Sequence, residues 1–393
     1  MTVTAVPSGA ELVGRATELV PRLRSHAVWM EENRRAHDDV LEALRESGLF
    51  RMRVPRRYGG FESDMRTTVE VISELARGDA SVAWTAAVYA ISTWMAGLFP
   101  DEVQDEIFVD PDVRISGILS PTVQAVPAAG GVVLDGRWTF NSGARHSEWN
   151  TCAAVLVDGD GQPQPVMVAV PLADLTVVDD WHTSGLRGSG SVSTVAENVF
   201  VPDARVLHMG PVLAGRHGSE RNADRPLWRA PFMPTACATV GAPALGMAKA
   251  ARESFMERLP GRKISYTDYE SQREAPLTHL QLAEAVLRTD EAAFHAFRAA
   301  DLLDSKAVAG ETWTLEERAR VRLDLGAVCR RSQEAVDILS SASGGSSVYT
   351  DVPIQRIERD MRTMSRHAII HPNTNLELYG RVLAGLGPNT LYL

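Results

Sequence analysis

Residues 135–150 read DGRWTFNSGARHSEWN, a strand-like run that ends in a tight turn at Asn141-Ser142-Gly143. Similar segments lie on both sides of it: they are short, rich in Val, Thr and aromatic residues, and separated by Gly, Pro and Asp. They occupy residues 115–119, 130–140, 150–158, 164–171, 175–181 and 193–202, and the Gly/Asp run at 158–162 predicts one of the turns between them. This pattern predicts a small antiparallel β domain over residues 114–212.

Helical patterns fill the chain before and after that domain. Apolar residues recur at a helical step over residues 11–50, 67–77, 81–99 and 101–109, which predicts an N-terminal helical domain at 1–113. The same step returns over residues 236–258, 276–303, 315–341 and 354–370, and it predicts a C-terminal four-helix bundle within residues 213–393. We therefore expect a mostly α protein with a central β domain, in which residues 215–231 form a mobile polar loop.

The segment VAWTAAVYAISTWMAGLF at 82–99 contains no charged residue and reaches the lower length of a membrane-spanning helix. It also contains Thr85, Ser92 and Gly97, and Asp79 and Asp101 bracket it closely. We expect a buried core helix rather than a membrane span.

The composition of the 393 residues argues against several classes of protein. The formal net charge of −10 argues against nucleic acid or an anionic membrane surface as the partner, because phosphate groups are bound by basic surfaces. Cys152, Cys237 and Cys329 lie far apart, in neither a zinc pattern nor a disulfide framework, so we expect no metal site and a reducing, cytoplasmic location. The chain begins without a basic and then apolar stretch, so no secretory signal is expected.

Several blocks of the sequence together resemble one known superfamily. The chain resembles the acyl-CoA dehydrogenase fold superfamily and, within it, the two-component flavin-dependent monooxygenases, the group that contains the oxygenase component of p-hydroxyphenylacetate hydroxylase. The matching blocks are LEALRESGLFRMRVPRRYGG (41–60), ELARGDASVAW (74–84), DGRWTFNSGARHSEWN (135–150), GLRGSGSVSTVAENVFVPDARV (185–206) and PIQRIERDMRTMSRHA (353–368).

The resemblance implies a homotetramer built on the C-terminal bundle, with the flavin ring held between the β domain and the bundle. Reduced flavin (FMNH2 or FADH2) would come from a separate reductase and react with O2 to a C4a-hydroperoxide. That species would hydroxylate an aromatic or polyketide-like small molecule.

The resemblance also implies a set of flavin contacts. Ser142 matches a serine that meets the flavin near N5 and C4a, and a loop at 181–191 runs beside the ring. The expected cofactor contacts are Asn141, Ser142, Gly143, Trp181, Arg187, Gly188, Ser189, Gly344 and Gly345, with Arg262 as a weaker candidate and the hydroxyl of Ser191 as a further donor. The alternative is purely structural: an Asn-Ser-Gly turn, a Gly/Ser loop and a helix C-cap at 344–345 are ordinary features.

The resemblance makes His367 the expected catalytic partner of Ser142. A histidine with a pKa near neutrality suits proton transfer with a phenol or indole. The expected substrate contacts are Trp84, Tyr89, Trp94, His146 and His371. Each has a structural alternative, since aromatic residues at a helical spacing are also typical of a core, and a bundle histidine is often satisfied by a carbonyl.

Other functions remain open at this point. N- or S-oxygenation would use the same chemistry, and a flavin-free scaffold subunit is a third class. An acyl-CoA dehydrogenase commonly keeps a catalytic glutamate near residues 359–374, but this chain has no Asp or Glu between Asp360 and Glu377, which disfavours thioester dehydrogenation.

Overall fold

The computed structural model describes residues 6–157 and 161–393, so most of the turn predicted at 158–162 lies outside the described residues. Helices precede the sheet in the chain: α1 (Gly9–Asn33), α2 (Asp38–Glu46), α3 (Met65–Gly78), α4 (Ala80–Ala96) and α5 (Asp101–Ile107). The prediction of one helical segment at 11–50 is wrong in its middle. Arg34 has a left-handed backbone (φ 52°), which ends α1, and the His37 side chain accepts a hydrogen bond from the Asp39 N–H and so begins α2.

A seven-stranded sheet follows, in the order β5-β6-β2-β1-β3-β4-β7. Its strands are β1 (Ile115–Ala128), β2 (Gly131–Asn141), β3 (Trp149–Val157), β4 (Pro163–Pro171), β5 (Thr176–Val178), β6 (Val192–Pro202) and β7 (Val206–His208). The sheet is mostly antiparallel, as predicted, but β1 and β3 pair in parallel. This follows from the topology, because β2 reverses the direction of β1, the next turn reverses it again, and β3 then joins the other edge of β1.

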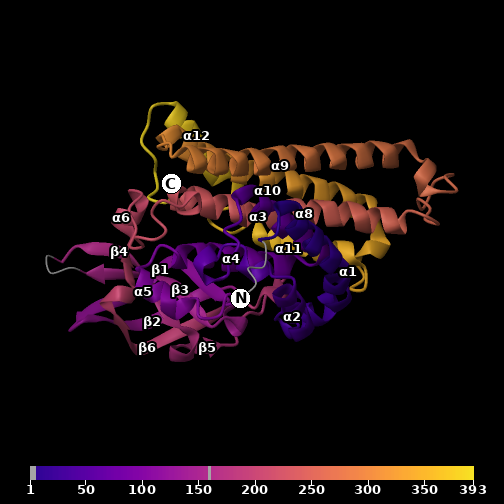
Figure 1. The fold of residues 1–393 in the computed structure, drawn as a ribbon. Helices are drawn as coiled ribbons and strands as arrows, with labels where there is room; N and C mark the ends of the chain where they lie inside the picture. The colour runs from indigo at the N-terminus through magenta and orange to yellow at the C-terminus, as the bar shows by residue number, and fades with distance from the viewer. Residues whose placement is uncertain (1–5, 158–160) are drawn as a thin grey trace.

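Helix α4 lies between the sheet and the helices above it (Figure 1), where it packs against β1 on one side and against α3 and α8 on the other. Asp79 begins this helix by accepting a hydrogen bond from the Val82 N–H at 2.9 Å. Nearly all of its side chains are buried, so the predicted core helix at 81–99 is confirmed. Among the helices formed by residues 6–157 and 161–393, none has the length and apolar character needed to cross a membrane.

The helices after the sheet are α6 (Met209–Leu213), α7 (Pro226–Arg229), α8 (Phe232–Arg258), α9 (Pro276–Ala309), α10 (Leu315–Ala342), α11 (Pro353–Met364) and α12 (Pro372–Leu383). Long helices α8, α9 and α10 pack side by side, with α11 against α8 and α10 (Figure 1), which is the predicted bundle. The helix predicted at 354–370 ends six residues early, at Met364. Pro372 then keeps His371 out of the helical region, at ψ 117°.

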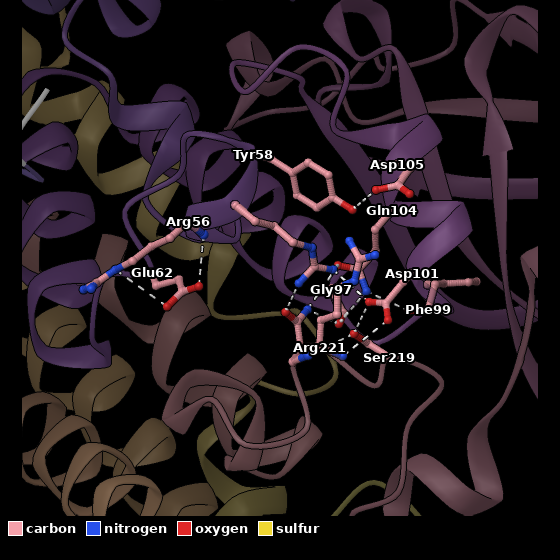
Figure 2. A network of polar contacts seen from close by, with 12 residues as sticks. Arg56, Tyr58, Glu62, Gly97, Phe99, Asp101, Gln104, Asp105, Ser219 and Arg221 are labelled. Carbon is pink, nitrogen blue, oxygen red and sulfur yellow. Dashed lines mark hydrogen bonds and ion pairs between the residues drawn. The ribbon is translucent and has the colours of Figure 1, made fainter. Parts of the chain in front are cut away.

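The loop predicted to be mobile, residues 215–231, is instead tied down by a buried polar network (Figure 2). Ser219 donates to Asp101 at 2.7 Å, and Gln104 donates to the carbonyl oxygen of Phe99 at 2.7 Å. The Asn222 amide donates to the carbonyl oxygen of Gly97 at 2.7 Å, and Asn222 also accepts from Arg57. These bonds attach the loop to the end of α4, so the loop positions a core helix.

Candidate active site

Ser142 follows the end of β2 and lies under the first half of α4. The Trp84 Nε1–H of α4 donates to the Ser142 hydroxyl at 2.9 Å. Ser142 Oγ lies 2.7 Å from Ser191 Oγ, which lies 2.8 Å from Ser189 Oγ. All three serines are buried, so two segments about fifty residues apart meet in one buried cluster of hydroxyl groups.

The turn at Gly143 is fixed by contacts that leave no room for a side chain. Gly143 has φ 75°, and a Cβ there would lie 2.6 Å from the Tyr89 hydroxyl. Tyr89 donates to the Gly143 carbonyl oxygen at 2.7 Å, and the Gly143 N–H donates to the Ser189 carbonyl oxygen at 3.0 Å. The strand end, the 185–191 loop and α4 are therefore held together at this glycine.

Leu186 is held in place within the 181–191 loop by hydrogen bonds made by both of its backbone groups. Its backbone is left-handed (φ 50°), its N–H donates to Asp360 Oδ1 at 2.6 Å, and its carbonyl oxygen accepts from Trp181 Nε1 at 2.9 Å. Gly185 lies against the backbone of Arg359, where a Cβ would clash. Helix α11 therefore determines the path of this loop.

Asp360 is a buried carboxyl group that the sequence analysis did not select. Burial, and then the nearby carboxyl group of Asp79, raise the pKa of Asp360 to about 7, while the Leu186 N–H opposes this shift. Burial raises the pKa of Asp79 as well. The only sequence signal was the position of Asp360 inside the block that carries His367.

His367 lies just after α11, in the turn that replaces the predicted helix end. Its ring centroid is 5.4 Å from that of Trp84, at 60° in an edge-to-face arrangement. His367 is exposed at the surface, but the protein packed around its ring desolvates the imidazole and so lowers the pKa of His367 below its usual value. A neutral imidazole therefore lies beside the Trp84–Ser142 pair.

The other two candidate histidines differ from His367 and from each other. His146 is half-buried, and its Nε2 atom has no hydrogen-bond partner within the described residues. Burial, and then the charges of Arg35 and Arg114, lower the pKa of His146 to about 4, so it is neutral near pH 7. His371 is exposed at the start of α12, and its Nδ1 atom lies 3.4 Å from the Thr374 hydroxyl oxygen.

Several predicted contact residues serve the protein's own packing. Trp94 donates to the Leu227 carbonyl oxygen at 2.9 Å and stacks on Phe232, away from the Ser142 cluster. Asn141 is fully buried, and its amide donates to Asn150 and Thr194.

Within the 181–191 loop, Arg187 donates to the Glu31 carbonyl oxygen at 3.0 Å, so its guanidinium is partly occupied. Gly188 packs against α1 and α4, where a Cβ would lie 3.1 Å from Ser81. Trp181 is half-buried and meets exposed Phe140 edge-to-face at 5.9 Å.

Gly344 and Gly345 belong to a second polar cluster. Arg262 donates to the Ser343 carbonyl oxygen, Arg258 donates to Ser346 at 3.3 Å, and the Gln272 amide donates to the Ala342 carbonyl oxygen at 2.9 Å. Within the described residues the charge that acts on Arg262 is that of Arg258 and not of a carboxylate, and Arg258 Nη1 and Gln272 Oε1 are buried without a partner. Space around Gly345 is open to 4 Å. Arg258, which the sequence analysis missed, ends a helix whose pattern gave no sign of this role.

Both helical parts of the chain match known protein families. The family models for the acyl-CoA dehydrogenase N-terminal domain and C-terminal domain match residues 16–111 and 238–372. The flavin-dependent monooxygenase oxygenase subunit HsaA of Rhodococcus jostii (strain RHA1) is 31% identical over 379 residues, which are 95% of this chain and 98% of that protein. The chain belongs to the family of flavin-dependent monooxygenase oxygenase components.

Two further known proteins are similar to almost the whole chain. The oxygenase component of the FADH2-dependent resorcinol hydroxylase of Rhizobium sp. (strain MTP-10005) is 30% identical, over 97% of this chain and 96% of that protein. The solved structure of XiaF from Streptomyces sp., in complex with FADH2 and glycerol, is 32% identical, with a TM-score of 0.92 over 98% of both chains. The predicted superfamily, fold and oxygenase group are therefore confirmed.

Proposed function

We propose that this oxygenase component takes reduced flavin from a separate reductase and uses it with O2 to hydroxylate an aromatic small molecule. When bound, the reduced flavin would supply the two electrons that activate O2. The observation that carries the proposal is the buried contact between Trp84 and Ser142 beside His367, because it joins a ring-edge contact, an aromatic wall and a proton-transfer group in one place.

The residues present fit a flavin ring. Ser142 Oγ keeps one lone pair after its contacts with Trp84 and Ser191, and the glycine turn at 143 and the 185–191 loop present backbone close to it. The unpartnered Nε2 of His146 is a second polar atom at the same turn. We assign the ring edge to Ser142 and Gly143, with Trp181 beside the ring.

His367 supplies the proton chemistry in this proposal. In the neutral form, Nδ1 of His367 accepts the Ile369 N–H at 3.3 Å; a phenol-type substrate would replace this contact and give its hydroxyl proton to Nδ1, which makes the aromatic ring more electron-rich. The edge-to-face ring of Trp84 fixes the direction of the imidazole. Trp84 and His367 together favour a flat aromatic guest over an aliphatic one.

Rapid mixing tests this function. The protein, loaded with FADH2 without oxygen, is mixed with oxygenated buffer, and the near-ultraviolet absorbance is followed. We expect an absorbing species that differs from oxidised flavin and outlives the reoxidation of free FADH2. Reoxidation at the rate of free flavin would refute the proposal, and bleaching of bound FAD by an acyl thioester without oxygen would support a dehydrogenase instead.

We further propose that the Arg258–Arg262–Gln272 cluster binds the phosphate groups of the flavin held by a neighbouring subunit. The segment between α8 and α9 lies at the end of the bundle away from the sheet (Figure 1). Arg258 and Arg262, which have no carboxylate partner within the described residues, lie beside an open glycine turn, and this arrangement suits a diphosphate. Arg262→Ala should then weaken binding of FADH2 about tenfold and of FMNH2 much less. Lys263→Ala, which removes an exposed pair with Glu270, is the control.

Helix α9 offers the surface for this assembly, which we propose to be a homotetramer. Leu280, Leu287, Phe294 and Val308 are 70%, 50%, 59% and 71% exposed and are spaced by seven or fourteen residues, so they form one apolar stripe. A stripe of this kind on a soluble chain is typical of a helix that packs against another subunit. A monomer in sedimentation velocity at micromolar concentration would contradict this proposal.

A further inference from the structure

Ser142, Ser191 and Ser189 form a buried chain of hydroxyl groups, and the contacts at its two ends determine which hydroxyl donates to which. Ser189 Oγ lies 2.6 Å from the Leu186 carbonyl oxygen, which only accepts hydrogen bonds, so the single Ser189 hydroxyl proton is committed there. Ser191 must then donate to Ser189 across 2.8 Å, and Ser142 must donate to Ser191 across 2.7 Å.

The contact at the Ser142 end of the serine chain is consistent with this order of donation. Trp84 Nε1 is only a donor, and it donates to Ser142 at 2.9 Å. Ser142 therefore donates its hydroxyl hydrogen to Ser191 and accepts the Trp84 N–H with one of its two lone pairs. The remaining lone pair makes Ser142 an acceptor, and not a donor, toward any ligand.

Reversing this direction is costly in the folded protein. If Ser142 turned its proton toward a ligand, its oxygen and that of Ser191 would face each other with lone pairs at 2.7 Å. Turning Ser191 and Ser189 as well would break the bond from the Ser189 hydroxyl to Leu186, which costs about one hydrogen bond because the Leu186 carbonyl oxygen keeps its bonds from Trp181 Nε1 and the Ser189 N–H. The three serines are only 4%, 4% and 2% exposed, so water does not offer replacement partners.

We propose that Ser191 and Ser189 are positioning residues that hold Ser142 as an acceptor and so make the site select reduced over oxidised flavin. The inference rests on the proposed function, in which Ser142 meets the ring edge. Reduced flavin carries a hydrogen on N5 and can donate to Ser142, whereas N5 of oxidised flavin has only a lone pair. Oxidised flavin therefore gains no hydrogen bond from Ser142.

The test measures binding rather than turnover. Dissociation constants of oxidised FAD and of FADH2 are determined for the wild type, Ser191→Ala and Ser189→Ala, together with the midpoint potential of the bound flavin. Each substitution frees the Ser142 proton to turn toward N5 of oxidised flavin. We expect the preference for FADH2 to fall about tenfold, as for one hydrogen bond, which lowers the midpoint potential of the two-electron couple by about 30 mV.

Ser193→Ala is the matched control, because Ser193 is equally buried but donates to Asp180 at 2.6 Å, outside the chain of serines. An unchanged preference for FADH2 in both Ser191→Ala and Ser189→Ala, or an equal change in Ser193→Ala, would overturn the inference while leaving the proposed function intact. A wild type that binds both redox forms equally would do the same. Failure of the wild type to bind either form would instead overturn the proposed function. If Ser191→Ala does not fold, Ser189→Ala alone decides.

Discussion

Replacing Asp360 by asparagine should make the protein more stable at alkaline pH and not at acid pH. The Asp360 side chain is 4% exposed, and its Oδ1 atom accepts the Leu186 N–H at 2.6 Å. Burial, together with the nearby Asp79, raises the pKa of Asp360 to about 7 from 3.8. Asparagine keeps the acceptor oxygen for Leu186 but cannot ionise.

The sign follows from the raised pKa in the folded state. The stability that the protonated group contributes is fully present below about pH 4, where both folded and unfolded chains are protonated, and is lost as the pH rises through about 7. A shift of about 3 units corresponds to about 4 kcal/mol of unfolding free energy by pH 8. Asp360→Asn removes this loss. With an unfolding entropy of about 0.8 kcal/mol per kelvin for a chain of this length, the melting temperature at pH 8 should rise by about 5 °C.

Thermal unfolding of wild type and variant between pH 4 and pH 8 checks this reasoning. The melting temperatures of the two should converge at pH 4 and diverge steadily above pH 5. Asp351→Asn, which replaces an exposed carboxylate just before α11, is the control and should show no such divergence. A variant less stable than the wild type at pH 8 would show that the Asp360 carboxylate is charged and stabilising, and would refute the argument.

Three further predictions concern the site and the assembly. His367→Asn should lower turnover of an aromatic substrate at pH 7.5 by about 100-fold and remove the loss of activity that the wild type shows as acid protonates the neutral imidazole; an unchanged pH profile would contradict this. Trp84→Phe keeps an aromatic ring but removes the donor to Ser142, so urea unfolding should show a loss of about 1 kcal/mol, and no loss would count against that bond. Leu287→Asp should dissociate the oligomer in sedimentation velocity, whereas Val126→Asp, at a similarly exposed residue (56%) on β1, should leave its mass unchanged.

The sequence predicted the layers of this fold well because they depend on short patterns. Helical steps and turn residues act over a few residues, so the helices and most of the strands were predicted. The break at Arg34 was not, because it depends on one left-handed residue within a continuous helical pattern. The end of α11 was also missed, although Pro372 gave a local signal.

The candidate site was harder to predict because its contacts join distant segments. Trp84 and Trp94 were both expected at a substrate. Ten residues on a helix turn the side chain by about 1000°, which is about 80° short of three full turns, so the two rings point about 80° apart. Trp94 accordingly packs on Phe232 in the core. Arg187 has the chemistry of a phosphate ligand, yet the nearby Glu31 carbonyl oxygen occupies its Nε atom, and no local pattern encodes that neighbour.

Leu186 connects the stability of the fold to the chemistry of the site. Its N–H donates to Asp360 of α11, and its carbonyl oxygen accepts the hydroxyl that sets the direction of the serine chain. The left-handed backbone of this residue allows both bonds at once, because it turns the two groups toward different elements. Asparagine at 360 preserves the acceptor for the N–H and so leaves the loop in place, while substitutions at Ser189 or Ser191 leave Asp360 untouched. The pH dependence of stability and the selection of flavin redox state should therefore respond to different substitutions, although they meet at one residue.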